Sequence, residues 1–315
     1  MIQTLLSLAL CAAAPKALLT PDQPMAVPGG AAHFDFMNID PTNRLVFAEH
    51  PGKSQVVVVN LDTKSITNVD LEAECNGIGI DAAGKRAFAA GPGKTLVRID
   101  LTTLKKTGSL ALDGPGDCVQ YDAKRGVVYV DNDDGTNLWV VDPDTMKLKG
   151  AVTIKEAPEY MEIDQSNNRI FQAIKSTSSV QVIDPDSLTV LAEWGLGDLT
   201  SPHGLALDRK AGLVFVAGKN GKLDILSMKT GKILNTVNIV NGSDQIAYDA
   251  GLKRVYIPGE SKIQIVQISG DKGAVAGDVP VGKDCHRVAI DPKTHDVWVA
   301  YQDGTDSFVQ RFAAG

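Results

Sequence analysis

The sequence predicts an all-β protein: a seven-bladed β-propeller of four-stranded antiparallel blades, with the ring closed by an N-terminal strand. The first observation behind this prediction is a short apolar segment ending in aspartate, which recurs along the chain. The anchor aspartates are Asp40, Asp81, Asp122, Asp164, Asp208, Asp249 and Asp291, at spacings of 41, 41, 42, 44, 41 and 42 residues. A period in this range is typical of propellers and solenoids.

The second observation is that each repeat contains the same order of strand and turn patterns. The apolar alternation before the aspartate, as in residues 78–80, predicts a short strand with alternate side chains buried. A polar turn follows, such as the one that Asp40 and Pro41 begin, because Asp accepts backbone N–H groups and Pro presets φ. Residues 213–216 and 56–59 are examples of the second and third strands. A more irregular fourth strand ends each unit.

The third observation concerns the two ends of the chain. The last repeat stops at residues 312–315, after its third strand, while residues 24–27 precede the first repeat and could supply the missing fourth strand. Such pairing closes a ring and removes an exposed sheet edge, which a linear solenoid would leave open. We therefore expect residues 15–315 to form a single propeller domain.

Composition limits the partners that the protein could bind. The chain has 315 residues, of which 43% are hydrophobic and 22% charged, so it can bury a large core. Its formal net charge is −7 and its pI is about 5.3. No run of Lys and Arg offers a basic patch, so we expect no nucleic-acid partner. No segment after the N-terminus has the ~18 apolar residues that a transmembrane helix needs.

The N-terminal segment, residues 1–14, is an apolar run that ends in small residues, which is typical of an export signal. This interpretation places the protein in the periplasm or outside the cell. A lipoprotein signal, with a lipid on Cys11, is the first alternative. An ordered N-terminal helix is the second, and the absence of a polar face disfavours it.

The repeat form of residues 202–208, 213–216 and 222–226 resembles the YVTN-type β-propeller repeat family of exported bacterial proteins. The resemblance extends from about residue 25 to the C-terminus. It implies the fold rather than a function, because such propellers include lactonases, lyases, cofactor-dependent enzymes and binding scaffolds. Propellers that hold pyrroloquinoline quinone carry a Trp after an Asp-x-x-Thr-Gly-Lys turn. Residues 228–232 approach this turn, but no Trp follows them, so this cofactor is not expected. Haem is not expected either, because the chain has no Cys-x-x-Cys-His motif.

The candidate site lies at one mouth of the channel, where the innermost strands begin. Five positions before the anchor aspartates the repeats carry Asp35, Asn76, Asp117, Glu159, His203, Asp244 and His286. His203, Asp244 and His286 form a nitrogen and oxygen set suited to a transition metal. Asp35, Asn76, Asp117 and Glu159 form an oxygen arc suited to calcium or magnesium, and Arg287 could hold an anionic ligand. Polar residues at a wet channel mouth also need no ligand at all, so a divalent metal ion stays one of two interpretations.

Other polar residues accompany this ring. The loops after the second strands place His50, Lys175, Lys219 and Glu260 on the same face. Cys75, Cys118 and Cys285 lie just before the inner strands of three repeats. Cys75 and Cys118 belong to neighbouring blades and could form a disulfide. Cys285 and His286 could help His203 hold a soft metal, or the thiols could simply pack as small buried groups.

Two function classes follow. The first is a monomeric, exported, non-enzymatic propeller that binds a small molecule, a metal ion or a protein partner at the channel mouth. The second is a metal-dependent hydrolase or lyase of the lactonase kind, in which the cation polarises a carbonyl and Glu159, Asp244 or a histidine moves a proton.

Overall fold

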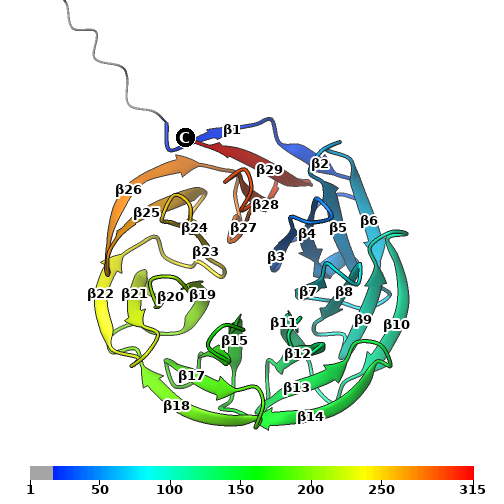
Figure 1. The fold of residues 1–315 in the computed structure, drawn as a ribbon. Helices are drawn as coiled ribbons and strands as arrows, with labels where there is room; N and C mark the ends of the chain where they lie inside the picture. The colour runs from blue at the N-terminus through cyan, green and yellow to red at the C-terminus, as the bar shows by residue number, and fades with distance from the viewer. Residues whose placement is uncertain (1–16) are drawn as a thin grey trace, which may run out of the picture.

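The computed structural model describes residues 17–315, which form a seven-bladed β-propeller (Figure 1). Each blade is an antiparallel sheet whose first strand lies at the central channel and whose last strand lies at the outside. The predicted export signal falls outside the described residues. Within residues 17–315 the only helix is the 3-10 turn η1 (Pro51–Lys53), and no helix is long and apolar enough to cross a membrane.

The blades use corresponding strands in the same order. The inner strands are β3 (Met37–Asp40), β7 (Gly77–Asp81), β11 (Gly116–Asp122), β15 (Pro158–Asp164), β19 (Pro202–Asp208), β23 (Ala247–Asp249) and β27 (Arg287–Ile290). The second strands are β4 (Leu45–His50), β8 (Arg86–Ala90), β12 (Val127–Asn132), β16 (Arg169–Ile174), β20 (Leu213–Gly218), β24 (Arg254–Gly259) and β28 (Val297–Asp303). The third strands are β5 (Gln55–Asn60), β9 (Thr95–Asp100), β13 (Asn137–Asp142), β17 (Ser179–Asp184), β21 (Lys222–Ser227), β25 (Lys262–Ser269) and β29 (Asp306–Ala314). The outer strands are β6 (Ile66–Asp70), β10 (Lys105–Ala111), β14 (Lys147–Thr153), β18 (Thr189–Gly195), β22 (Ile233–Asn238), β26 (Lys272–Pro280) and, in the last blade, β1 (Leu19–Pro21) with β2 (Met25–Val27).

The anchor aspartates are turn residues, as the sequence predicts. Asp40 shows the pattern: its Oδ1 accepts the backbone N–H groups of Thr42 and Asn43, each at 2.9 Å. All seven anchors are buried, so their oxygens need these partners to offset the loss of water. They hold the turns of the blades and do not belong to the channel mouth.

The core lies between neighbouring blades. The second strand of each blade carries an aromatic residue at the same repeat position, and each of these side chains is 1% exposed or less. These residues are Phe47, Phe88, Tyr129, Phe171, Phe215, Tyr256 and Trp298. In the first blade Phe47 packs with Ile78 and Ala87 of the second blade. Burial of one such side chain stabilises the fold by about 1.5–3 kcal/mol. Because these contacts hold the ring together, the residues at the channel mouth can differ from blade to blade.

The ring closes as expected, with one addition. Strand β29 pairs with β28 on one side and with both β1 and β2 on the other, where Leu19 faces Ala314 and Val27 faces Ser307. The sequence predicted only the segment that contains β2. The last blade therefore takes its outer strand from the N-terminal part of the chain, and both neighbours of β29 are filled.

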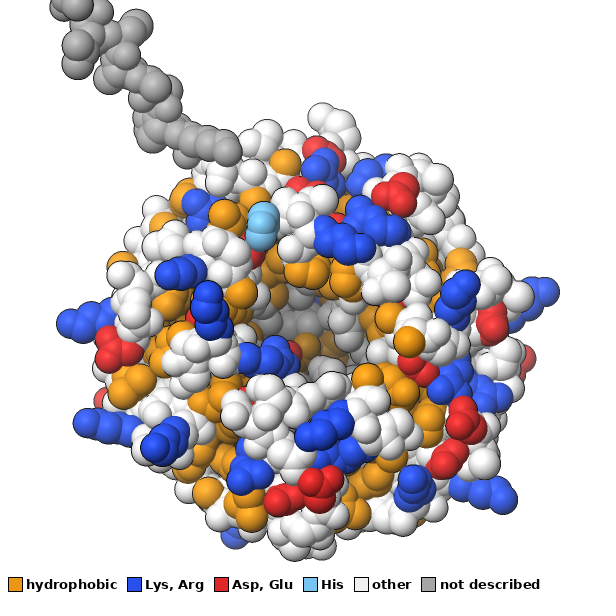
Figure 2. Space-filling model, in the orientation of Figure 1, with side chains coloured by type: hydrophobic (Ala, Val, Ile, Leu, Met, Phe, Trp, Pro, Cys, Tyr) orange, Lys and Arg blue, Asp and Glu red, His pale blue; other side chains and the backbone are white. Residues whose placement is uncertain are grey.

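The two ends of the channel differ in their residues. We call the end where the inner strands begin, together with the turns after the second strands, the channel mouth. The turns after the anchor aspartates lie at the other end, which we call the opposite opening. Figure 2 shows the opposite opening as a central hollow with Lys and Arg side chains around it.

Candidate functional site

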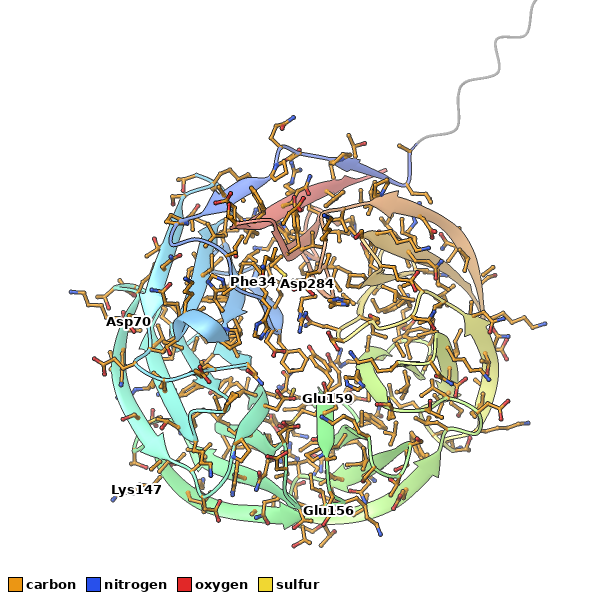
Figure 3. The ribbon with its side chains drawn as sticks, turned by 180° about the vertical axis from the view of Figure 1, so that it is seen from behind. Phe34, Asp70, Lys147, Glu156, Glu159 and Asp284 are labelled. Carbon is orange, nitrogen blue, oxygen red and sulfur yellow. The ribbon has the colours of Figure 1, made fainter. Side chains whose placement is uncertain are left out.

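The ring residues lie at or just before the start of the inner strands, at the channel mouth. Figure 3 views this face, with Glu159 close to the axis of the ring and Glu156 at the outside. Neighbouring inner strands approach closely here, because a Cβ built on Gly77 would lie 2.0 Å from the carbonyl oxygen of Asp117. The ring residues of adjacent blades are therefore within reach of each other.

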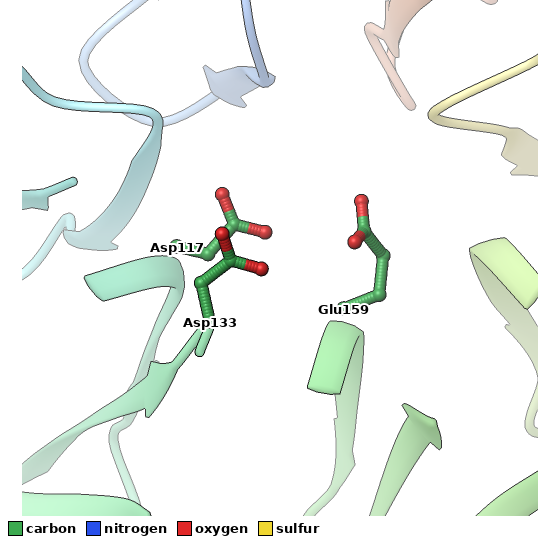
Figure 4. A group of neighbouring side chains, drawn as sticks. All are labelled: Asp117, Asp133 and Glu159. Atoms are coloured by element: carbon green, nitrogen blue, oxygen red, sulfur yellow. The ribbon is translucent and has the colours of Figure 1, made fainter. Parts of the chain in front are cut away.

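The first half of the mouth is acidic. Asn76 Nδ2 donates to Asp117 Oδ1 at 3.0 Å, which joins the second and third blades. Carboxylate oxygens of Asp117, Asp133 and Glu159 all lie within 4.8 Å of one another, and we call these residues the acidic trio (Figure 4). Lys175 lies among them, with Nζ 2.5 Å from Glu159 Oε2 and 3.0 Å from Asp133 Oδ1. One ammonium group thus offsets part of the charge of three carboxyls.

Burial and nearby charges determine the protonation states of the carboxyl groups and of Lys175 in the acidic half of the mouth. It raises the pKa of Glu159 to about 7, although Lys175 acts in the opposite direction. Burial also raises the pKa of Asp117 well above its usual range, and the neighbouring Glu159 adds to the effect. For Lys175, burial lowers the pKa, but the attraction and hydrogen bonds of Glu159 and Asp133 together outweigh it and the net shift is upward. Near neutral pH the lysine is charged and Glu159 is poised between its two protonation states.

The second half of the mouth is rich in cations. Asp244 pairs with Lys219 and, at 3.3 Å, with Arg287 Nη2. Asp35 Oδ1 lies 3.9 Å from the same Nη2. Burial raises the pKa of Asp35 to about 6, against the lowering effect of Arg287. The Arg287 side chain is buried, and its buried Nε–H has no hydrogen-bond partner among the described residues, so one donor of this side chain is unsatisfied.

The two ring histidines bond to backbone carbonyls. His203 Nδ1 lies 2.9 Å from Ser201 O, and His286 Nδ1 lies 2.9 Å from Gly242 O. Burial lowers the pKa of His203 to about 3, so its ring is neutral and Nδ1 must carry the proton that the carbonyl accepts. Its Nε2, 3.9 Å from Glu159 Oε1, is then a proton acceptor directed toward the acidic trio.

These contacts bear on the predicted sites. His203, Asp244 and His286 each have other partners, and among residues 17–315 the side chains close enough to share an ion are those of the acidic trio. A metal at His203, Asp244 and His286 stays a prediction. Asp133, in the turn directly after β12, is a member of the trio that was not predicted from the sequence. That position matches Lys175, which the sequence did place at the mouth, so the turn itself was the available signal.

Of the four predicted rim residues, Glu260 is exposed and its Oε1 accepts Asn241 Nδ2 at 3.4 Å, and the other three divide into two groups. Lys175 and Lys219 reach the carboxyls of the mouth. His50 instead is fully buried, stacked on Phe34 with ring centroids 4.6 Å apart, and its Nε2 lies 3.1 Å from Ala32 O. Its role is therefore in packing the first blade.

The proposed disulfide between Cys75 and Cys118 is wrong. Cys75, Cys118 and Cys285 are all free and buried, so they fit the third interpretation, that of small packed groups. Each lies in its own blade interface, where apolar neighbours surround it.

We predict that these three thiols react only after unfolding. Burial raises the pKa of Cys285 to about 12 and also raises the pKa values of Cys75 and Cys118, so neither access nor thiolate is available in the native state. In a Cys11→Ser variant, a thiol reagent should count no reactive thiols in buffer and three in denaturant without reductant. Two missing thiols in denaturant would restore the disulfide, and rapid native reaction would contradict the burial.

The fold and the mouth together define a seven-bladed β-propeller with buried acids and paired cations at one end of its channel. Residues 48–223 match the family model of glutamine cyclotransferase, which is more than half of the chain. The protein belongs to the glutamine cyclotransferase family. The resemblance to YVTN-type repeats stays a prediction, since the matching model is that of a different propeller-type family.

Solved structures agree with the fold. A chain in the crystal structure of a mitotic checkpoint complex has a TM-score of 0.78 at 16% identity, covering 98% of this chain and 99% of that one. A chain of hydrazine synthase from Kuenenia stuttgartiensis has a TM-score of 0.77 at 14% identity, covering 92% and 99%. At these identities the likeness supports the architecture alone. No curated protein matches the chain.

Proposed function

We propose that the protein is an enzyme of acid–base chemistry that acts at the channel mouth and closes an amine onto a carboxamide, as in the cyclisation of glutamine. One observation carries this proposal: Glu159 is held beside Lys175 near the channel axis with a pKa of about 7. A group that titrates near the working pH is the best proton carrier. The family to which the chain belongs supplies the reaction class.

The reaction needs one proton carrier and no other reactant. The α-amine of glutamine attacks the carbon of its own side-chain amide, so one C–N bond forms, another breaks and ammonia leaves. Ionised Glu159 takes a proton from the attacking amine and then returns it to the leaving nitrogen. His203 Nε2, 3.9 Å from Glu159 Oε1, offers a second acceptor beside it.

The two halves of the mouth suit the two ends of such a substrate. An amine is attracted by the acidic trio, where Asp133 and Glu159 share the single cation of Lys175. The oxygen that gains negative charge as the ring closes is best placed near the cationic half. There the free Nε–H of Arg287 and the ammonium of Lys219 could stabilise it.

The test is ammonia release from a dipeptide with an N-terminal glutamine. The matched control peptide carries an acetylated α-amine, which cannot attack. We expect release from the free peptide only, together with a product 17 mass units lighter, which follows from the loss of ammonia. Equal release from both peptides would indicate simple hydrolysis, and no release from either would overturn the proposed reaction.

The acidic trio favours a second candidate, binding of a hard cation such as calcium or magnesium. Both function classes predicted from the sequence, the non-enzymatic binder and the metal-dependent hydrolase of the lactonase kind, could use this cation site. Lys175 bonds to two of the three carboxyls, so an ion would have to displace its ammonium. Calcium titration of the wild type and of Lys175→Met separates the two candidates. If the trio is a native cation site, the wild type binds calcium. If only Lys175→Met binds calcium, Lys175 occupies the site in the wild type and a native cation site is excluded.

We also propose that the protein acts outside the cytoplasm as a monomer. The apolar run in residues 1–14 and the net charge of −7 support export and solubility. N-terminal sequencing of protein recovered from the periplasm, combined with its mass in solution, tests both points. A full-length N-terminus in the cytoplasmic fraction would argue against export.

A further inference from the structure

A buried side chain divides the channel into two parts. Gln245 extends from the sixth blade to the seventh and first blades, where its Oε1 accepts the N–H of Val288 at 3.3 Å and that of Met37 at 3.0 Å. Its Nε2 donates to Met37 O at 2.8 Å. Beside it the rings of Phe36 and Tyr160 pack with centroids 5.3 Å apart. Gln245, Phe36 and Tyr160 form a partition between the channel mouth and the opposite opening.

On the far side of this partition is a cavity of about 180 Å³, lined by the inner strands of the first blade and the last four. The cavity exists because one repeat position, two residues before the anchor aspartate, carries small side chains in three consecutive blades. These residues are Ala206, Ala247 and Ala289. The same position carries Asn38 in the first blade and Glu162 in the fourth. The cavity therefore has an apolar wall of small residues and a polar wall facing it.

Arg209 lies at the entrance of this cavity. Its Nη2 donates to Glu162 Oε2 at 2.9 Å and to Ile163 O at 2.7 Å, while the side chain is 46% exposed. It follows the anchor Asp208 directly, and no other repeat has a charged residue at that position. Nη2 supplies both of these bonds, so the guanidinium still has N–H groups to offer, and guanidinium binds carboxylates through paired hydrogen bonds.

We propose that this cavity is a second ligand site, for a short-chain organic carboxylate. The carboxylate pairs with Arg209 at the opposite opening, and the hydrocarbon part packs against Ala206, Ala247 and Ala289. A volume of about 180 Å³ equals that of about six water molecules and is below the range of sites for larger ligands. The Lys and Arg side chains around the hollow in Figure 2 favour an anion at this end.

The site is independent of the proposed function, because the partition separates it from Glu159. The probes are butanoate and its neutral counterpart butanamide, titrated by calorimetry into the full chain at constant ionic strength. We expect saturable binding of butanoate, and binding of butanamide weaker by about tenfold or more, since the amide lacks the charge that strengthens the bonds to Arg209.

Variants locate the binding. Arg209→Gln removes the cation and Ala247→Leu fills the cavity, and each should weaken butanoate binding by about tenfold or more. Ala289→Val is a second, smaller filling change if Ala247→Leu does not fold. Lys210→Gln, on the next residue of the same turn, and Glu159→Gln at the mouth should leave binding unchanged.

Three outcomes overturn the proposal. The first is the absence of saturable butanoate binding to the wild type, and the second is binding that survives both Arg209→Gln and a filling variant. Loss of binding in Glu159→Gln would place butanoate at the mouth and also contradict the second site. Absence of ammonia release by the wild type, with its butanoate binding intact, would count against the proposed function alone.

Discussion

A Glu159→Gln variant should lose about 10²- to 10⁴-fold in kcat for ammonia release, the range expected when a general acid–base group is removed. Glutamine keeps the size of the side chain and can still accept a hydrogen bond from Lys175, but it cannot carry a proton at neutral pH. The steady-state rate with a glutaminyl dipeptide is the measurement.

The matched control is Glu156→Gln. Glu156 lies three residues earlier, exposed at the outside of the same face (Figure 3), and the change removes the same charge from the chain. We expect its kcat to stay within a factor of two or so of the wild type, since isolated surface charges contribute little. Equal losses in both variants, or none in Glu159→Gln, would remove Glu159 from the proton-transfer step.

The same variant should become more stable than the wild type as the pH rises. The pKa of Glu159 is raised from 4.5 to about 7 by burial, so the folded protein holds this proton more tightly than the unfolded chain does. The wild type is therefore favoured below about pH 4.5 and loses that advantage as the pH rises to about 7. A glutamine at this position does not titrate and escapes the loss.

The expected size follows from the shift. Glu159→Gln should gain about 3 kcal/mol in unfolding free energy relative to the wild type between pH 4 and pH 8. Urea unfolding of both proteins at each pH measures this difference, which cancels the titration of shared groups far from position 159. Glu156→Gln should show little change relative to the wild type over the same range. A relative stability of Glu159→Gln that stays flat or falls would contradict the raised pKa.

These two predictions have one physical cause, the burial of Glu159, which favours proton transfer and lowers the stability of the fold at neutral pH. A carboxyl that is buried near a lysine has a pKa suited to moving protons, and the cost of ionising it is taken from the stability of the fold. The interfaces between blades, each with a buried aromatic side chain, contribute the stability that offsets this cost.

Much of the mouth could be predicted from the sequence because a repeat fixes position. Once the anchor aspartates were aligned, counting back five residues identified Asp117 and Glu159, which the structure brings within 4.8 Å. Asp133 occupies the same repeat position as Lys175, directly after the second strand, but the residue type at this position varies from blade to blade, so the repeat alone did not mark it as part of the site. Nor could the repeat show that Lys175 lies between Asp133 and Glu159, since that depends on the directions of three side chains.

The sequence by itself determined the architecture of this protein: the number of blades, the role of the aspartates in the turns and the closure of the ring. It could do so because each blade is specified by short-range strand and turn patterns that repeat seven times. Only the tertiary structure decided the chemistry. The tertiary structure decides which carboxyl shares a cation, which thiols remain apart and where Gln245 lies, because each depends on contacts between different blades, such as that between Gln245 and Met37. Burial at those contacts then sets the protonation of Glu159 and the space left beside Arg209.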